Sequence, residues 1–235
     1  MLRIRGLEAG YGQIQVLWGI DLEVPRGEIT CIVGSNGAGK TTMLRAISRV
    51  VRSTRGTIEF DGTDLTNATP ATVIRAGIAH VPEGRRLFRG LPVRDNLLLG
   101  AYLRREPRVD ILKDLDFVYG LFPILRERQA QDATTLSGGE QQMCAIGRGL
   151  MSRPKLLMID ELSLGLAPRA VERVIAALEE IKKTGVTILI VEQDVLTALE
   201  LAQQGAVIEM GRVSLTGPTD VLQRDPRVRQ AYLGI

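Results

Sequence analysis

Apolar residues occur along this chain in short runs, separated by polar stretches that contain glycine. The runs predict strands at residues 2–8, 21–24, 28–33, 57–60, 78–81, 156–159, 186–191 and 206–209. Continuous apolar strands that alternate with helices predict a mostly parallel sheet covered on both faces. The closely spaced strands near the start predict a small antiparallel layer joined to that sheet.

Helical periodicity lies between these runs. Residues 40–50 predict one helix, and residues 168–183 predict another, since Pro168 suits a first helical turn and an apolar stripe follows it. From about residue 83 to residue 151, helical patterns dominate and β-branched runs disappear. The sequence therefore predicts an α/β core formed by residues 1–82 and 152–235, into which residues 83–151 are inserted as a helical subdomain.

Composition narrows the class of protein. The chain has 235 residues, 45% of them apolar but only 4% aromatic, so its core must consist mainly of aliphatic side chains. Its net charge of +3 is small and dispersed, which argues against nucleic acid as a partner. Cys31 and Cys144 stand in apolar surroundings and are expected to be reduced. No run approaches the ~20 apolar residues of a membrane span, and no secretory signal opens the chain, so we expect a cytoplasmic protein.

A glycine-rich segment joins a predicted strand to a predicted helix at residues 34–42. It matches the pattern G-x-x-x-x-G-K-[ST] in the strand–loop–helix context that this pattern requires. Glycines let the backbone fold so that N–H groups point at phosphates, and the helix start adds positive charge. The nucleotide-binding residues predicted here are Gly34, Ser35, Asn36, Gly37, Ala38, Gly39, Lys40, Thr41 and Thr42. We expect Lys40 to reach the β and γ phosphates and Thr41 to offer its hydroxyl to Mg²⁺.

Two carboxylates, Asp160 and Glu161, follow the apolar strand at residues 156–159. The carboxyl ends of parallel strands face the ligand crevice of a sheet. We therefore expect Asp160 to hold Mg²⁺, through water, and Glu161 to polarise the attacking water. Taken alone, such a pair is more often a helix start or a solvated turn, and the phosphate loop is what favours the chemical interpretation.

A second glycine-containing helix start lies at residues 136–140. Ser137 suits an N-cap, and Gly138 and Gly139 expose backbone N–H groups. One chain already has one phosphate cradle, so a second anion-binding helix start indicates two chains that share each nucleotide. A capped helix after a glycine turn is the alternative when this motif is considered alone.

The order of these three motifs resembles that of the ATP-binding-cassette ATPases over nearly the whole chain. The resemblance implies a P-loop NTPase fold with a RecA-like core, an antiparallel β layer and a helical subdomain. It implies a head-to-tail dimer in which part of one subunit closes over the ATP held by the other. The residues expected to bind in this way are Ser137, Gly138, Gly139 and Glu140.

The same resemblance assigns a base-binding face near the start of the chain. It implies that Tyr11 stacks on adenine and that Val16 lies near the same face. An ordinary Tyr-Gly turn is the alternative for Tyr11. Trp18 is expected to pack in the core instead.

Three positions depart from the usual pattern of this family. Glu83 stands where a Gln is common, and its carboxylate could ligate Mg²⁺ together with Thr41 and Asp160. Gln193 stands where a His is common; its amide can donate a hydrogen bond to phosphate but cannot carry a proton as imidazole does. Ala167 replaces an Asp at the dimer seam. The predicted catalytic residues are accordingly Glu161, Gln193 and Lys40.

These departures, and the C-terminal segment at residues 225–234, resemble one branch of the family: the ATPase subunits of branched-chain amino-acid importers. This implies a subunit that uses ATP and Mg²⁺, lies peripherally on the inner face of the cell membrane, and works with permease subunits. It also implies a second ATPase chain, identical or different, and indirectly a solute-binding protein.

Other functions stay open at this point. A urea or short-amide importer ATPase shares much of the pattern. A non-transport cassette ATPase is disfavoured, because the chain has no tandem cassette, coiled coil or zinc insertion. A regulatory module that scarcely hydrolyses ATP is disfavoured by the intact Lys40, Asp160 and Glu161. Residues 95–103 read equally as a partner-facing or a core segment.

Overall fold

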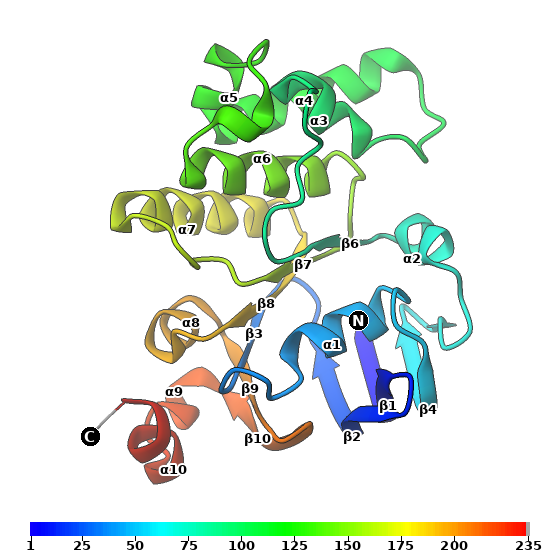
Figure 1. The fold of residues 1–235 in the computed structure, drawn as a ribbon, viewed down its shortest axis with the longest axis vertical. Helices are drawn as coiled ribbons and strands as arrows, with labels where there is room; N and C mark the ends of the chain where they lie inside the picture. Colours follow the sequence, from blue (N-terminus) through cyan, green and yellow to red (C-terminus); the bar gives the residue numbers. More distant parts are fainter. Residues whose placement is uncertain (234–235) are drawn as a thin grey trace.

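Two sheets and a group of helices make up the computed structural model, which describes residues 1–233 (Figure 1). Gly234, which belongs to the C-terminal motif noted above, lies outside the described residues.

The larger sheet has six strands in the order β10-β9-β3-β8-β7-β6. Its members are β3 (Ile29–Val33), β6 (Ile78–Val81), β7 (Leu156–Asp160), β8 (Thr187–Glu192), β9 (Gln204–Glu209) and β10 (Arg212–Pro218). All neighbours pair in parallel except β10, which is antiparallel to β9. Every residue of β3, β7 and β8 is buried, since helices or strands cover both faces of the sheet. The predicted parallel sheet is confirmed.

The smaller sheet is antiparallel and has the order β2-β1-β4-β5. Its strands are β1 (Leu2–Tyr11), β2 (Ile14–Val24), β4 (Ser53–Phe60) and β5 (Thr63–Asp64). The sequence predicted only the last third of β2, at residues 21–24. Register shifts between β1 and β2 interrupt the two-residue alternation that reveals a strand, so the first part of β2 was missed.

Within residues 1–233, seven helical segments accompany the sheets outside the predicted subdomain: α1 (Lys40–Ile47), α2 (Pro70–Ala76), α7 (Pro168–Lys183), α8 (Val195–Leu201), α9 (Thr219–Leu222), α10 (Pro226–Val228) and the π-helical turn η2 (Arg229–Leu233). Helix α7 has the predicted bounds. Helix α1 is shorter than predicted because Arg49 adopts a left-handed backbone, with φ of 60°, which ends the helix.

In the described chain, the named elements between β6 and β7 are all helical: α3 (Val93–Leu99), α4 (Arg108–Leu121), α5 (Pro123–Glu127), the 3₁₀ turn η1 (Ala133–Thr135) and α6 (Gly138–Leu150). One isolated antiparallel bridge, between Pro92 and Asp132, accompanies them. These helices form the upper part of the molecule in Figure 1. In the segment at residues 95–103, Leu97 is fully buried in the core whereas Tyr102 is 67% exposed. A partner-facing role for the exposed part stays a prediction. The subdomain boundaries at residues 83 and 151 stay a prediction.

Two apolar cores lie on opposite faces of the larger sheet. One unites side chains of α6, α7 and α8, and the other unites α1 with the antiparallel layer. Cys31 and Cys144 both belong to the first core, and burial raises the pKa of each thiol to about 12. Within residues 1–233 no helix has the length and apolarity to cross a bilayer.

The expectation for Trp18 is wrong. Its side chain is 43% exposed and lies against the guanidinium of Arg212, 6.0 Å from the ring centre. Neighbouring Leu17 is fully buried, since adjacent residues of a strand face opposite sides. Apolar character alone did not indicate which of the two faces the core.

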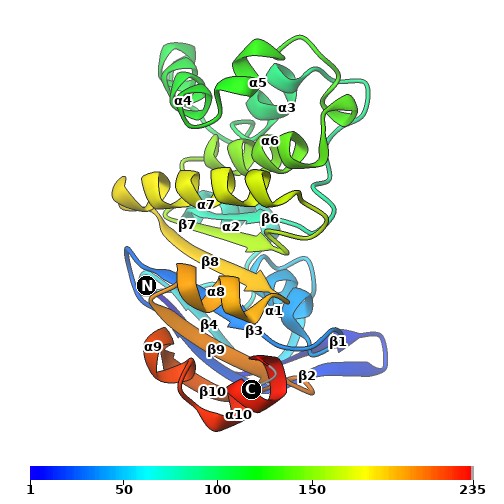
Figure 2. The ribbon, with the colours of Figure 1, turned by 90° about the vertical axis from the view of Figure 1, so that its left-hand side faces the viewer.

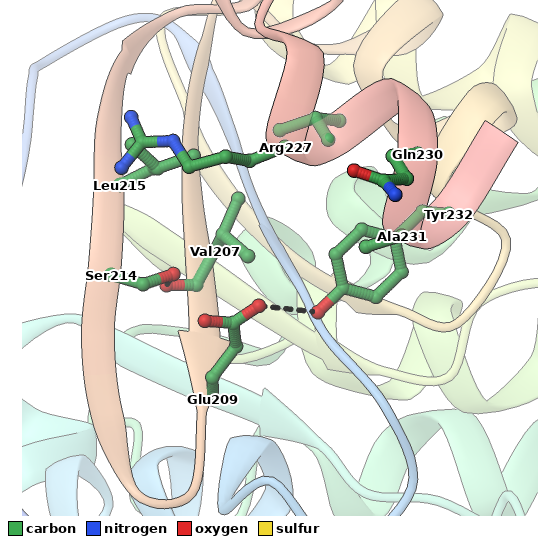
Figure 3. A pocket seen from close by; sticks show the side chains of 9 residues that line it. Val207, Glu209, Ser214, Leu215, Arg227, Gln230, Ala231 and Tyr232 are labelled. Atoms are coloured by element: carbon green, nitrogen blue, oxygen red, sulfur yellow. Dashed lines mark hydrogen bonds between the residues drawn. The ribbon is translucent and has the colours of Figure 1, made fainter. Parts of the chain in front are cut away.

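Helix α10 and the turn η2 pack beside the β9–β10 hairpin, at the end of the molecule opposite to the α3–α5 helices (Figure 2). A cavity of about 430 Å³ lies between this part of the chain and the hairpin. At its edge the Tyr232 hydroxyl donates to a carboxylate oxygen of Glu209 at 3.3 Å (Figure 3).

Candidate functional site

The phosphate loop runs from the end of β3 to the start of α1. The Lys40 side chain is buried in it, and its ammonium donates to the carbonyl oxygens of Gly34 and Ser35 at 2.8 and 3.2 Å. A Cβ atom at Gly34 would lie 2.2 Å from the Ile208 carbonyl oxygen, so glycine is what lets strand β9 approach the loop. The loop thus holds a positive charge at its centre and presents backbone around it.

The turn between β9 and β10 holds this loop from outside. The Gly211 N–H donates to the Ala38 carbonyl at 2.9 Å, and the Gly211 carbonyl accepts from the Trp18 N–H of β2 at 2.9 Å. Gly211 has φ of +73°, and a Cβ there would lie 1.8 Å from the Val16 carbonyl oxygen. The turn therefore connects the phosphate loop to the antiparallel layer through one glycine.

An open hollow of about 480 Å³ lies beside the loop. It is lined by Val16, Asn36, Gly37, Gly39, Lys40, Thr41, Thr42, Glu83, Glu161 and Gln193. Residues predicted from five separate parts of the sequence thus meet around one space. Tyr11 lies close by, since its hydroxyl accepts from Arg45 at 3.1 Å and from Thr42, on the loop, at 3.5 Å.

Asp160 ends strand β7 next to this hollow. Its Oδ1 accepts from the Thr41 hydroxyl at 3.1 Å, whereas its Oδ2 is buried and has no hydrogen-bond partner among residues 1–233. Burial raises the pKa of this carboxyl to about 6; the Thr41 hydrogen bond opposes the rise, and the charges of Glu161 and Glu83 add to it. A buried carboxylate oxygen without a donor, beside a hydroxyl and a second carboxylate, fits an oxygen-seeking divalent cation.

Glu161 and Gln193 are paired. The Gln193 side-chain amide donates to a carboxylate oxygen of Glu161 at 3.0 Å. Glu161 has a left-handed backbone, with φ of 57°, and its N–H donates to the Val191 carbonyl at 3.0 Å. Such a conformation is strained for a residue other than glycine and is typical of functional sites.

Glu192, the residue before Gln193, was not predicted. It is 2% exposed; one oxygen accepts from the Ser163 N–H at 2.7 Å and the other from the Gln193 N–H at 3.1 Å. Burial raises the pKa of this carboxyl, and the Ser163 hydrogen bonds oppose the rise. A charged residue that ends an otherwise apolar strand, beside a candidate catalytic residue, was the available signal.

The second glycine-containing helix start, at residues 136–140, lies apart from the hollow. Helix α6 begins with a reciprocal cap: the Ser137 hydroxyl accepts from the Glu140 N–H at 3.4 Å, and the Glu140 carboxylate accepts from the Ser137 N–H at 2.9 Å. The predicted N-cap is confirmed. None of the four residues from Ser137 to Glu140 lines the hollow.

His80, the single histidine, does not line the hollow either. It lies in β6, as expected of a strand residue, and its Nδ1 is 3.1 Å from the Ser48 hydroxyl. Burial lowers the pKa of its imidazole to about 4.

A parallel sheet with a phosphate loop at the carboxyl end of one strand and paired carboxylates at the end of another defines a P-loop nucleoside-triphosphate-binding protein. Comparison with known proteins identifies the family. The ABC transporter family matches residues 17–163 of the chain. BraG, a high-affinity branched-chain amino acid transport ATP-binding protein of Pseudomonas aeruginosa, is 43% identical over 234 residues, 100% of each chain.

Two further comparisons agree. LivF of Archaeoglobus fulgidus, a probable branched-chain amino acid transport ATP-binding protein, is 34% identical and spans 100% of this chain and 99% of its own. A solved ATP-binding subunit of an ABC transporter superposes with a TM-score of 0.85 at 29% identity, over 100% of this chain and 96% of that one. The chain belongs to the ABC transporter family, as an ATPase subunit.

Proposed function

We propose that this protein hydrolyses ATP to energise an importer of branched-chain amino acids. The observation that carries the hydrolytic part is the Glu161–Gln193 hydrogen bond of 3.0 Å beside the phosphate loop. The solute rests on the printed functions of the relatives BraG and LivF.

Different residues of the chain bind the phosphates, the adenine and Mg²⁺. Lys40 and the backbone N–H groups at residues 34–42 bind the phosphates. Tyr11 stacks on the adenine and Val16 packs on the same side. Thr41, Asp160 and Glu83 would hold Mg²⁺, which neutralises charge on the phosphates when it is bound.

Glu161 polarises the attacking water, since its carboxylate lines the hollow and can accept a proton. The other carboxylate in the lining, Glu83, is assigned to Mg²⁺. Gln193 orients Glu161 and donates a hydrogen bond to the terminal phosphate. A carboxamide does not titrate, so the role of base belongs to Glu161 and not to Gln193.

The complete site needs two chains. Ser137, Gly138, Gly139 and Glu140 lie away from the chain's own hollow, which supports their closing over the ATP of a second ATPase subunit, identical or different. Closure of the two ATPase subunits moves permease subunits in the membrane. The protein therefore works peripherally, on the inner, cytoplasmic face of that membrane. A solute-binding protein acts on it only indirectly.

Steady-state Mg²⁺-dependent ATP hydrolysis by the purified chain tests this proposal. We expect measurable turnover in the unmodified chain, a fall of about a hundredfold or more in Glu161→Gln, and a partial fall of about tenfold in Gln193→Ala. Tight ATP binding without turnover, in the presence of permease subunits, would show a binding module instead. Leucine and urea uptake by cells lacking the chain then separates the two candidate solutes.

A further inference from the structure

A buried carboxylate stands directly beside the catalytic pair without touching the hollow. Glu192 is the last residue of β8 and is 2% exposed, and it does not line the space that would hold the nucleotide. Burying a carboxylate is costly unless donors surround it. Its carboxylate oxygens accept from two backbone N–H groups, that of Ser163 at 2.7 Å and that of Gln193 at 3.1 Å.

The hydrogen bond from Ser163 joins two residues, Ser163 and Glu192, that are 29 positions apart in sequence. Ser163 belongs to the loop that follows Glu161 and leads to the start of α7, whereas Gln193 follows β8. Two charge-assisted bonds to one carboxylate fix the separation of the two backbones. The backbone on the far side of Gln193 is fixed as well, because the Asp194 side chain caps α8 by accepting from the Thr197 N–H at 3.2 Å.

These hydrogen bonds determine where the Gln193 side chain lies. Its side chain is exposed, yet its amide lies 3.0 Å from the Glu161 carboxylate. A flexible, exposed side chain holds such a position only when its backbone is fixed. The carboxylate of Glu192 fixes the Gln193 backbone on its N-terminal side, and it also binds the loop that carries Ser163.

We propose that Glu192 is a positioning residue for hydrolysis, which acts through Gln193 by holding it in register with Glu161 and with the loop after Glu161. This rests on the proposed role of Glu161 and Gln193. Since that loop runs toward Ala167, where the dimer seam is expected, a partner chain that shifts Ser163 would shift Gln193 through the same carboxylate.

The replacement Glu192→Gln keeps the size of the side chain and removes its charge. The carboxamide has one acceptor oxygen where the carboxylate has two, so one of the two N–H groups loses its partner. We expect kcat to fall about tenfold, as misplacement of a catalytic group does, while the KM for ATP changes less than twofold. Glu200→Gln, on the exposed face of α8, is the matched control and should leave both constants unchanged.

A double-mutant cycle separates positioning from a general structural role. If Glu192 acts through Gln193, Glu192→Gln lowers kcat in the unmodified chain but changes it less than twofold in the Gln193→Ala background. Equal falls in both backgrounds, or no fall in the unmodified chain, would overturn the inference. Melting temperatures identify variants that unfold, and Glu192→Asp, which keeps the charge but shortens the reach, then replaces Glu192→Gln in the cycle.

Different experimental results would contradict the role of Glu192 and the proposed function. An unmodified chain that hydrolyses ATP, without coupling between residues 192 and 193, contradicts the inference alone. An unmodified chain that shows no hydrolysis with its permease subunits contradicts both.

Discussion

At the scale of single residues, two buried ionisable groups have pKa values displaced toward their neutral forms. Burial raises the pKa of the Asp160 carboxyl to about 6, from 3.8, and lowers that of the His80 imidazole to about 4, from 6.5. For Asp160, a divalent cation that supplies positive charge at the orphaned oxygen would relieve this cost. His80 does not line the hollow beside the phosphate loop, so its lowered pKa bears on the stability of the fold and not on the chemistry of the site.

His80 should make the protein less stable in mild acid. Between pH 6.5 and about 4 the unfolded chain binds a proton at this residue that the folded chain does not. Its contribution is therefore complete above pH 6.5 and is lost as the pH falls toward 4. Because His80 as a whole residue is half-buried, we expect a loss of about 2 kcal/mol in the free energy of unfolding, less than the full pKa shift would give.

Urea unfolding between pH 7 and pH 4.5 measures this effect. His80→Asn keeps a hydrogen-bonding atom near Ser48 and does not titrate, so its stability should fall less over the same range. Asp160 is present in both chains and drops out of the comparison. Parallel curves for the two proteins would show that His80 is not the group responsible.

At the scale of elements, the β9–β10 hairpin bridges the phosphate loop and the antiparallel layer, in addition to their direct contact at Thr42 and Tyr11. Its Gly211 bonds to Ala38 on one side and to Trp18 on the other. Sequence patterns gave no indication of this connection. Strand β10 was not predicted, because its burial alternates between half-buried and exposed and offers no apolar run.

Gly211→Ala should weaken nucleotide binding. The added Cβ meets the Val16 carbonyl oxygen at 1.8 Å, so the turn must move and release its bond to Ala38. We expect the Kd for ATP to rise about tenfold, the loss of one hydrogen bond to a loop that binds phosphate, measured with a fluorescent ATP analogue.

Gly62→Ala is the control for backbone strain alone. Gly62 has a similar φ of +78°, but a Cβ there meets nothing within 4 Å. It should lower the melting temperature without changing the Kd. If both variants lose affinity equally, the effect comes from strain and not from the phosphate loop.

How much of the fold was predictable also depended on the element. The strands β3, β6, β7, β8 and β9 were found because both of their faces are buried, which leaves a continuous apolar signal. Lys40, Thr41, Asp160 and Glu161 were found because their chemistry requires fixed local spacing. Glu192 and Trp18 were not, since the role of each depends on neighbours distant in sequence.

At the scale of the whole molecule, the hollow and the α6 helix start are separate parts of one chain. We expect ATP to pair two chains when hydrolysis is blocked by Glu161→Gln. Light scattering after size-exclusion chromatography should then give twice the 25.7 kDa mass of the chain with ATP present, and the single mass without it.

Gly138→Asp should abolish this pairing. The nearest atoms to a Cβ at Gly138 belong to the end of the flexible Arg85 side chain, at 3.2 Å and beyond, so a single chain should tolerate the change. Across the dimer the new carboxylate would face phosphate and repel it. The Kd for ATP of the single chain should stay the same, and a dimer that persists would exclude Gly138 from the shared site.

The burial of Cys31 and Cys144 has a practical consequence. Thiolate is the reactive form of cysteine, and both thiols are kept protonated and out of contact with reagents. The natural chain is therefore a silent background for maleimide chemistry. A single cysteine introduced at an exposed position would carry a spin label or a fluorophore while both native cysteines stay in place, so opening and closing of the pair could be followed in real time.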